Sequence, residues 1–291
     1  MTAAGFHPDP SRPRLCLPPG ACDSHVHVFG PQSRFPFPPD RTFTPADAPK
    51  EALFALHAML GIGRCVVVQS SAHGFDNAAA ADAISAKDGT CRGVALLPPD
   101  ADDATLRRLD RQGFRGVRFN YMGHLGRQVP MQDVLGLAGR LAGIGWHLQI
   151  HLDPSLFADL APALLRTPVP VVIDHMGRIP ADPGVNHPGF THLLRLLEDG
   201  RFWVKVSGAD RASLAGPPYA DAVQMARALA AHAPDRVLWG TDWPHPNHAG
   251  PMPDDGALVD LIAGIAPGRA AQQALLVDNP HRLYRFAEPQ A

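Results

Sequence analysis

Residues 22–28 read Cys-Asp-Ser-His-Val-His-Val, a short run in which a single valine separates two histidines. Successive side chains of a β-strand point to opposite faces, so His25 and His27 point to the same side of this segment. One face of the strand can therefore direct two imidazoles toward one ligand. The run predicts a β-strand whose inner face carries chemically active groups.

Seven further apolar runs with strand character follow along the chain, at residues 65–70, 93–97, 116–120, 147–152, 169–174, 203–207 and 237–242. Most are nearly continuous rather than alternating, which is typical of parallel strands buried on both faces. Helical patterns lie between them, for example at residues 78–86, 104–112 and 222–231. Strands that recur at intervals of roughly 22 to 42 residues, with helices between them, favour a closed barrel over a doubly wound sheet.

The length of the chain also suits one barrel. It has 291 residues, and (β/α)8 barrels of about 250 residues commonly fold as a single domain. No Gly-x-Gly-x-x-Gly motif follows the first strand, which argues against a dinucleotide-binding fold. We therefore predict an α/β protein with a single (β/α)8 TIM barrel over residues 21–286 and an N-terminal extension over residues 1–20. The proline-rich residues 34–40 are expected to form a loop near the mouth of a pocket.

The charge and composition of the chain narrow the kinds of partner that the protein can bind. The net charge is −2 with 15 histidines counted as neutral, so nothing indicates binding to nucleic acid or to an anionic membrane surface. The four cysteines show no Cys-x-x-Cys spacing, and reduced thiols are the expectation. The N-terminus lacks the pattern of a signal peptide, and no apolar run reaches about 18 residues. We expect a cytoplasmic protein that acts on a small molecule; the oligomeric state does not follow from the sequence.

Polar side chains stand where several predicted strands end, which is where (β/α)8 barrels carry their active sites. His151 and His175 end the fifth and sixth strands, and Asp242 ends the eighth. Each of these residues alone is equally well explained as a buried core histidine or as the cap of a turn. Together with His25 and His27 they form a set of neutral imidazoles and a carboxylate, the ligands that Zn²⁺ or a similar divalent ion prefers.

Eight motifs run in order from about residue 20 to 285: DSHVHVFGP (23–31), RFPF (34–37), HGFDN (73–77), RGVRFN (115–120), VIDHMGR (172–178), DR-x4-GPP (210–218), GTDWPHPN (240–247) and NPHRLY (279–284). In these motifs the chain resembles the amidohydrolase-2 group of the amidohydrolase superfamily. Within that group it is most similar to the branch of 2-pyrone-4,6-dicarboxylate lactonases. The most specific of the motifs is GTDWPHPN.

The resemblance implies an amidohydrolase-like barrel and a carboxylic ester hydrolase that opens a small acidic lactone in the catabolism of a carbon source, such as an aromatic compound. It implies that Asp242 takes a proton from the hydrolytic water and then returns it to the leaving oxygen. His25, His27 and His175 would polarise the carbonyl, directly or through a metal. The residues expected to contact the substrate are Arg118, Arg211, Ser70, Ser71, His124 and His245.

The chain departs from the pattern of that branch at three places. His151 stands where the lactonases carry a tyrosine, residues 122–124 replace an arginine, and Phe43 lies near the position of a second tyrosine. The lactonases of that branch work without metal. A phenol is a poor zinc ligand and a neutral imidazole is the commonest one, so His151 with His25 and His27 predicts a bound divalent metal, Zn²⁺ in the first place. A metal-free mechanism remains the alternative.

These departures alter the site expected to bind the acidic groups of the substrate, so they disfavour 2-pyrone-4,6-dicarboxylate itself. They favour a related lactone, such as a muconolactone, a sulfomuconolactone or a sugar-acid lactone. Two other functions remain open. A metal-dependent decarboxylase would use the same histidines and Asp242, and an isomerase of a sugar-acid lactone would use Asp242 to move a proton or an acyl group. A binding protein without catalysis is disfavoured, because so many titratable groups at strand ends are costly to bury without a use.

Overall fold

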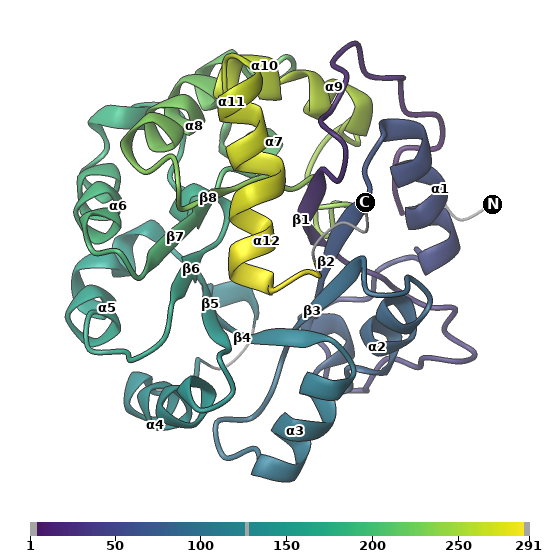
Figure 1. Ribbon diagram of the computed structural model, residues 1–291, viewed down its shortest axis with the longest axis vertical. Helices are drawn as coiled ribbons and strands as arrows, with labels where there is room; N and C mark the ends of the chain where they lie inside the picture. The colour runs from purple at the N-terminus through teal and green to yellow at the C-terminus, as the bar shows by residue number, and fades with distance from the viewer. Residues whose placement is uncertain (1–4, 126–127, 288–291) are drawn as a thin grey trace.

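The computed structural model describes residues 5–125 and 128–287, so the first four residues of the predicted N-terminal extension lie outside the described part. Eight parallel strands form one sheet in which their order in space follows their order in the chain. The strands are β1 (Cys22–Val26), β2 (Arg64–Val68), β3 (Cys91–Ala95), β4 (Phe114–Tyr121), β5 (His147–Leu152), β6 (Val171–Ile173), β7 (Phe202–Lys205) and β8 (Val237–Leu238). They confirm the predicted (β/α)8 barrel (Figure 1).

Most of the helices surround the strands on the outside of the barrel, and the last two cross one end of it (Figure 1). The helices are α1 (Lys50–Leu60), α2 (Ala78–Ser85), α3 (Asp103–Arg111), α4 (Met131–Ala142), α5 (Phe157–Leu164), α6 (Pro188–Glu198), α7 (Ala209–Ala212), α8 (Ala220–His232), α9 (Asp255–Asp260), α10 (Ile262–Ile265), α11 (Arg269–Gln273) and α12 (Asn279–Tyr284). The start of α3 illustrates how the sequence defines the beginning of a helix. The Asp102 side chain caps α3 and accepts a hydrogen bond from the Thr105 backbone N–H at 2.7 Å. Leu106 and Leu109 on the inner face of α3 are buried. None of the helices in the described part of the chain is long and apolar enough to span a bilayer.

The barrel closes at a seam between β1 and the residues that follow β8. Strand β8 is shorter than the predicted 237–242, because its pairing with β7 ends at Leu238 and Asp242 has a φ of 68°. Backbone hydrogen bonds continue the seam, from Ser24 N to Trp239 O at 2.8 Å and from Asp242 N to His25 O at 2.9 Å. These bonds fix Asp242 against the strand that carries His25.

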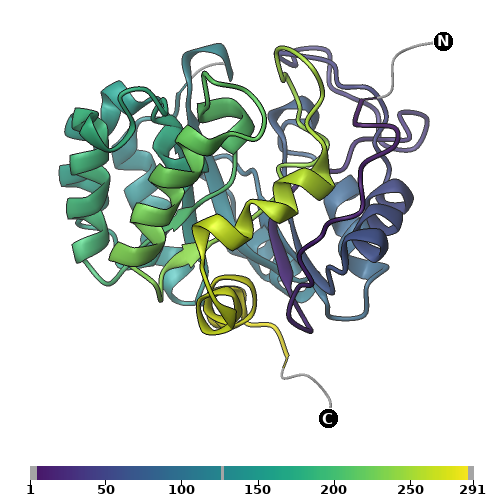
Figure 2. The same ribbon diagram turned by 90° about the horizontal axis from the view of Figure 1, so that it is seen from above.

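The two ends of the barrel differ. The C-terminal segment crosses the end where the strands begin, and Figure 2 shows it below the barrel. There the Arg64 guanidinium donates to Val277 O at 3.2 Å, and the Tyr284 ring meets the His147 ring edge-on with centroids 5.4 Å apart. Long loops border the opposite end, where the strands finish, and this end remains available for a binding site.

A buried carboxylate, Asp23, joins the seam to helix α1. Its Oδ1 accepts hydrogen bonds from the backbone N–H groups of Thr241 at 3.0 Å and His25 at 3.1 Å. Its Oδ2 accepts from Thr241 Oγ1 at 2.6 Å and lies 3.4 Å from His57 Nε2. Burial alone lowers the pKa of His57, but the neighbouring Asp23 and Cys65 outweigh burial and raise that pKa to about 9.

Replacement of His57 by Gln should therefore destabilise the protein in a pH-dependent way. Because the folded-state pKa of His57 is raised, its protonation stabilises the fold fully below about pH 6.5, and this contribution is lost as the pH rises through about 9. The difference in free energy of unfolding between wild type and His57→Gln should shrink across that interval when measured by chemical denaturation. A difference that stays constant from pH 6 to about 9.5 would refute the link between His57 and Asp23.

Candidate active site

A cavity of about 230 Å³ opens at the end of the barrel where the strands finish. Its wall consists of His27, Phe43, Ser70, Ser71, Arg118, His124, Leu125, His151, His175, Arg178, Arg211, Asp242, Pro246 and Asn247. The structure thus brings together most of the residues that the sequence singled out. Two of them, His25 and His245, are not part of this wall.

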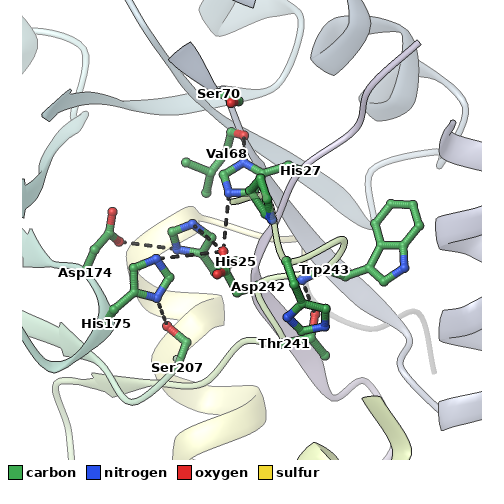
Figure 3. A network of polar contacts seen from close by, with 12 residues as sticks. His25, His27, Val68, Ser70, Asp174, His175, Ser207, Thr241, Asp242 and Trp243 are labelled. Carbon is green, nitrogen blue, oxygen red and sulfur yellow. Dashed lines mark hydrogen bonds and ion pairs between the residues drawn. The ribbon is translucent and has the colours of Figure 1, made fainter. Parts of the chain in front are cut away.

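Asp242 stands at the centre of the site, and three imidazoles converge on one of its oxygens (Figure 3). The Oδ1 atom lies 3.3 Å from His27 Nε2, 3.7 Å from His25 Nε2 and 3.8 Å from His175 Nε2. The other oxygen, Oδ2, accepts a hydrogen bond from Arg211 Nε at 2.6 Å. Burial alone raises the pKa of Asp242, but Arg211 and the imidazoles hold it well below 3.8, so the carboxylate is ionised.

In two of these rings, the nitrogen that does not face Asp242 is anchored outside the cavity (Figure 3). His27 Nδ1 lies 2.7 Å from the carbonyl oxygen of Val68, and His175 Nδ1 lies 2.9 Å from Ser207 Oγ. Burial lowers the pKa of His175 well below 6.5. The anchored rings therefore keep fixed orientations toward Asp242, as acid–base groups and metal ligands require.

His175 reaches the site through an unusual turn after β6. Four successive residues have positive φ: His175 (48°), Met176 (53°), Gly177 (66°) and Arg178 (57°). Non-glycine residues are uncommon in this region and cost of order 1–3 kcal/mol each, a strain that concentrates at functional sites. Glycine is required at position 177, because a Cβ atom there would lie 2.4 Å from the Phe157 ring.

A second buried carboxylate, Asp174, lies one layer deeper in the barrel. Its Oδ2 accepts hydrogen bonds from Arg118 Nε at 2.8 Å and from Gln149 Nε2 at 3.0 Å. Its Oδ1 lies 3.3 Å from His25 Nδ1 and 3.6 Å from Lys205 Nζ. Burial raises the pKa of Asp174, but Arg118, His25 and Lys205 outweigh burial and hold it well below 3.8.

Lys205 lies at the floor of the site, fully buried, with its Nζ 3.2 Å from His25 Nδ1 and 2.8 Å from Gln149 Oε1. Burial lowers the pKa of Lys205 to about 8. Burial, and then the Lys205 ammonium, lower the pKa of His25 to about 3, so the His25 ring is neutral. Sequence reasoning missed Lys205 and Asp174, although a lysine inside the apolar strand 203–207 was a usable signal.

His151, predicted to bind a metal, and His245, predicted to contact the substrate, have surroundings that differ from those predictions. His151 lines the cavity with Nδ1 3.3 Å from Asn120 Oδ1, and burial lowers its pKa well below 6.5. His245 is buried beneath the wall, with Nε2 3.1 Å from Asp255 Oδ1 and Nδ1 3.9 Å from Asp210 Oδ2. This position gives no support to the prediction that His245 contacts the substrate.

Within residues 5–125 and 128–287, two groups of side chains have ligand atoms close enough for one metal ion. One is His25, His27 and Asp242, and the other is His25, Asp174 and His175. His151 belongs to neither, so the predicted set of His25, His27 and His151 is not formed. The second group lies beside the Lys205 ammonium, which disfavours a cation there.

The first group fits a divalent metal. A backbone carbonyl can only accept, so His27 Nδ1 carries the proton toward Val68 O, and a neutral ring then has its lone pair on Nε2. That lone pair faces Asp242 Oδ1, a second acceptor, and a proton or a metal ion between the two satisfies both. Tetrahedral zinc with its usual bond lengths holds ligand atoms about 3.3–3.6 Å apart, close to the observed 3.3 and 3.7 Å.

Known proteins resemble this chain over nearly its whole length. The chain is 46% identical over 288 residues to a 2-pyrone-4,6-dicarboxylate hydrolase of Comamonas testosteroni, with 96% of this chain and 94% of the relative covered. It is 39% identical over 273 residues to a 4-sulfomuconolactone hydrolase of Rhizobium radiobacter, with 93% and 91% covered. The solved apo structure of an Agrobacterium tumefaciens protein matches with a TM-score of 0.83 at 28% identity, covering 94% of this chain and 99% of that one.

A family model described as amidohydrolase matches residues 22–286, which include all eight strands and every residue of the cavity wall. The match agrees with the family that the sequence motifs indicated. The chain belongs to the amidohydrolase family.

Proposed function

We propose that this protein is a hydrolase that opens the ester ring of a small anionic lactone. The observation that carries the proposal is the Asp242 carboxylate, which is held ionised by Arg211 while its free oxygen faces the imidazoles of His25, His27 and His175. Ester hydrolysis needs a base for water beside groups that polarise a carbonyl, and this cluster supplies both. The two relatives named above are hydrolases whose names specify a pyrone dicarboxylate and a sulfomuconolactone.

In the proposed reaction, Asp242 Oδ1 accepts a proton as the water oxygen forms a bond to the lactone carbonyl carbon. Because the pKa of Asp242 lies well below 3.8, proton transfer is favourable only as that bond forms, so the two events are coupled. The ring C–O bond then breaks, and Asp242 returns the proton to the departing ring oxygen. The imidazoles stabilise the charge that develops on the carbonyl oxygen.

Several cavity residues suit an anionic substrate. Arg118 and Arg211 each use one nitrogen for an internal carboxylate, and the guanidinium groups line the cavity with further N–H donors. Ser70, Ser71 and His124 also line it. We propose that these residues bind an acidic group of the lactone.

Replacement of Asp242 by Asn should lower kcat for lactone hydrolysis by on the order of 10²–10⁴ without loss of the fold, because an amide cannot accept the proton from water. The exposed Asp159 on α5 provides a matched control, and Asp159→Asn should retain wild-type kcat. Initial rates with a panel of acidic lactones provide the measurement, and circular dichroism checks the fold. Wild-type turnover by Asp242→Asn would remove Asp242 from the mechanism.

We further propose that the site holds one divalent ion, with zinc as the candidate. His25 Nε2, His27 Nε2 and Asp242 Oδ1 would hold it, with His175 Nε2 as the next nearest nitrogen to that carboxylate. When bound, such an ion polarises a carbonyl oxygen or lowers the pKa of a water molecule toward about 7. The alternative is a proton shared between His27 and Asp242, in which case the imidazoles act on the carbonyl directly.

Elemental analysis of the purified protein should then find about one equivalent of zinc per chain. Removal of the ion by a chelator should lower both the thermal midpoint and the activity, and zinc should restore them. His27→Gln should lose the metal, whereas His151→Tyr should keep it, because His151 lies outside the ligand group. A protein with less than about a tenth of an equivalent, full activity and an unchanged midpoint after chelation would show that the metal-free alternative holds.

A further inference from the structure

The turn after β8 carries Asp242, and its backbone contains several unfavourable conformations. Asp242, His245 and Asn247 have positive φ angles of 68°, 59° and 57°. Such angles are uncommon for residues other than glycine, and they persist where the surrounding structure holds them in place. The position of the Asp242 carboxylate therefore depends on contacts that other parts of the chain make with this turn.

One of these contacts comes from the N-terminal segment, residues 5–20, which passes α9 before the chain enters β1 (Figure 1). The Phe6 ring packs against the Trp243 ring, with centroids 5.1 Å apart and planes inclined by 46°. Trp243 follows Asp242 directly in the chain and is buried. Its ring points away from the imidazoles of the site (Figure 3). Phe6 thus supports the turn from outside the cavity.

The backbone of Trp243 connects this support to the groups of the site. Its carbonyl oxygen accepts a hydrogen bond from His27 N at 2.7 Å, and its N–H donates to Thr241 Oγ1 at 3.0 Å. A shift of Trp243 therefore moves Asp242 and changes its distance from His27 Nε2, which is 3.3 Å.

A second link leads from the same segment to the turn through α9. Ser11 N donates a hydrogen bond to Asp254 Oδ1 at 3.0 Å, at the start of that helix. The next residue, Asp255, has its Oδ1 3.1 Å from Nε2 of the buried His245. The His245 backbone N–H in turn donates to Asp242 O at 2.7 Å. The N-terminal segment therefore contacts the turn directly through one residue and indirectly through another.

We propose that Phe6 is a positioning residue for Asp242: its contact with Trp243 holds the turn after β8 in the geometry that directs the carboxylate at the imidazoles. Loss of the ring removes this contact and leaves the rest of the segment bound, because Arg14 still donates to Asp260 through its backbone N–H at 2.8 Å and through Nε at 2.9 Å. The effect on turnover rests on the proposed lactone hydrolase function.

Hydrogen exchange tests the hold on the turn without any substrate. Deuterium uptake by residues 239–248, followed by mass spectrometry, should be about tenfold faster in Phe6→Ala than in the wild type. Phe6→Tyr keeps the ring and should exchange as the wild type does. Phe54 on α1 provides the matched control, because it is also half-buried but its ring contacts Lys87 Nζ, at 4.4 Å, rather than Trp243. Phe54→Ala should leave uptake by residues 239–248 unchanged.

Steady-state kinetics provides the second readout. Phe6→Ala should lower kcat for lactone opening by about tenfold and change KM by less than about threefold, because a small displacement of the base slows the chemical step more than it weakens binding. Phe6→Tyr should restore kcat, and Phe54→Ala should keep wild-type kcat even if its thermal midpoint falls. A folded Phe6→Ala protein with wild-type kcat, or with wild-type uptake at residues 239–248, would overturn the proposal. Equal losses of kcat in Phe6→Ala and Phe54→Ala would also overturn it.

The two proposals fail in different ways. If the wild type opens no lactone but Phe6→Ala selectively speeds exchange at residues 239–248, the hold of Phe6 on the turn stands and the hydrolase function falls. If the wild type opens lactones and Phe6→Ala does so with unchanged kcat, only the role of Phe6 falls.

Discussion

Two carboxylates buried at the end of the barrel, Asp174 and Asp242, set the constraint on which the rest of the site depends. A carboxylate without a partner is too costly to bury in charged form. Each is therefore paired with an arginine, Arg118 at 2.8 Å and Arg211 at 2.6 Å, and the buried Lys205 adds a further cation beside Asp174. The ion pairs of Asp174 join the end of β6 to β4 and β7, and the ion pair of Asp242 joins α7 to the residues after β8, so the pairs fix these elements relative to one another.

The same pairing determines the acid–base state of the site. Both ionised carboxylates favour protonation of the neighbouring rings of His25 and His175, but burial and the cations that balance the carboxylates lower the pKa of both rings and keep them neutral. The site thus combines an ionised base with neutral imidazoles, which a simple row of buried histidines could not provide. Groups whose surroundings push their pKa values apart are well suited to divide the roles of acid and base. Lys205 adds a charge that is never exposed to solvent, so it acts on His25 and Asp174 rather than on the substrate.

The sequence was sufficient to predict the barrel, because continuous apolar runs report burial on both faces of a strand, and all eight runs became strands. It also predicted that His25 and His27 point to the same side, since alternation along a strand follows from backbone geometry alone, and both Nε2 atoms lie near Asp242 Oδ1. The length of β8 could not be predicted, because hydrogen bonds to β1 replace strand pairing after Leu238.

Residues that depend on contacts distant in sequence were harder to predict. His151 ends a strand like the other candidates, but only the distances between side-chain atoms show that it lies outside both groups of possible metal ligands. Arg178 was visible within a family motif, yet its place in the cavity wall depends on a turn of four positive φ angles. The sequence also cannot show which arginine pairs with which buried carboxylate, because these pairs join residues that are far apart in the chain.

The central claim is that water attacks the carbonyl carbon of a lactone in this site, and isotope labelling tests the claim most directly. A single turnover in water enriched in oxygen-18 should place one labelled oxygen in the new carboxylate and none in the oxygen that leaves the ring, as read by mass spectrometry at early times. Product without label would show that the enzyme rearranges its substrate rather than hydrolysing it. Label in the departing oxygen would show that water attacks elsewhere, and either result would contradict the account.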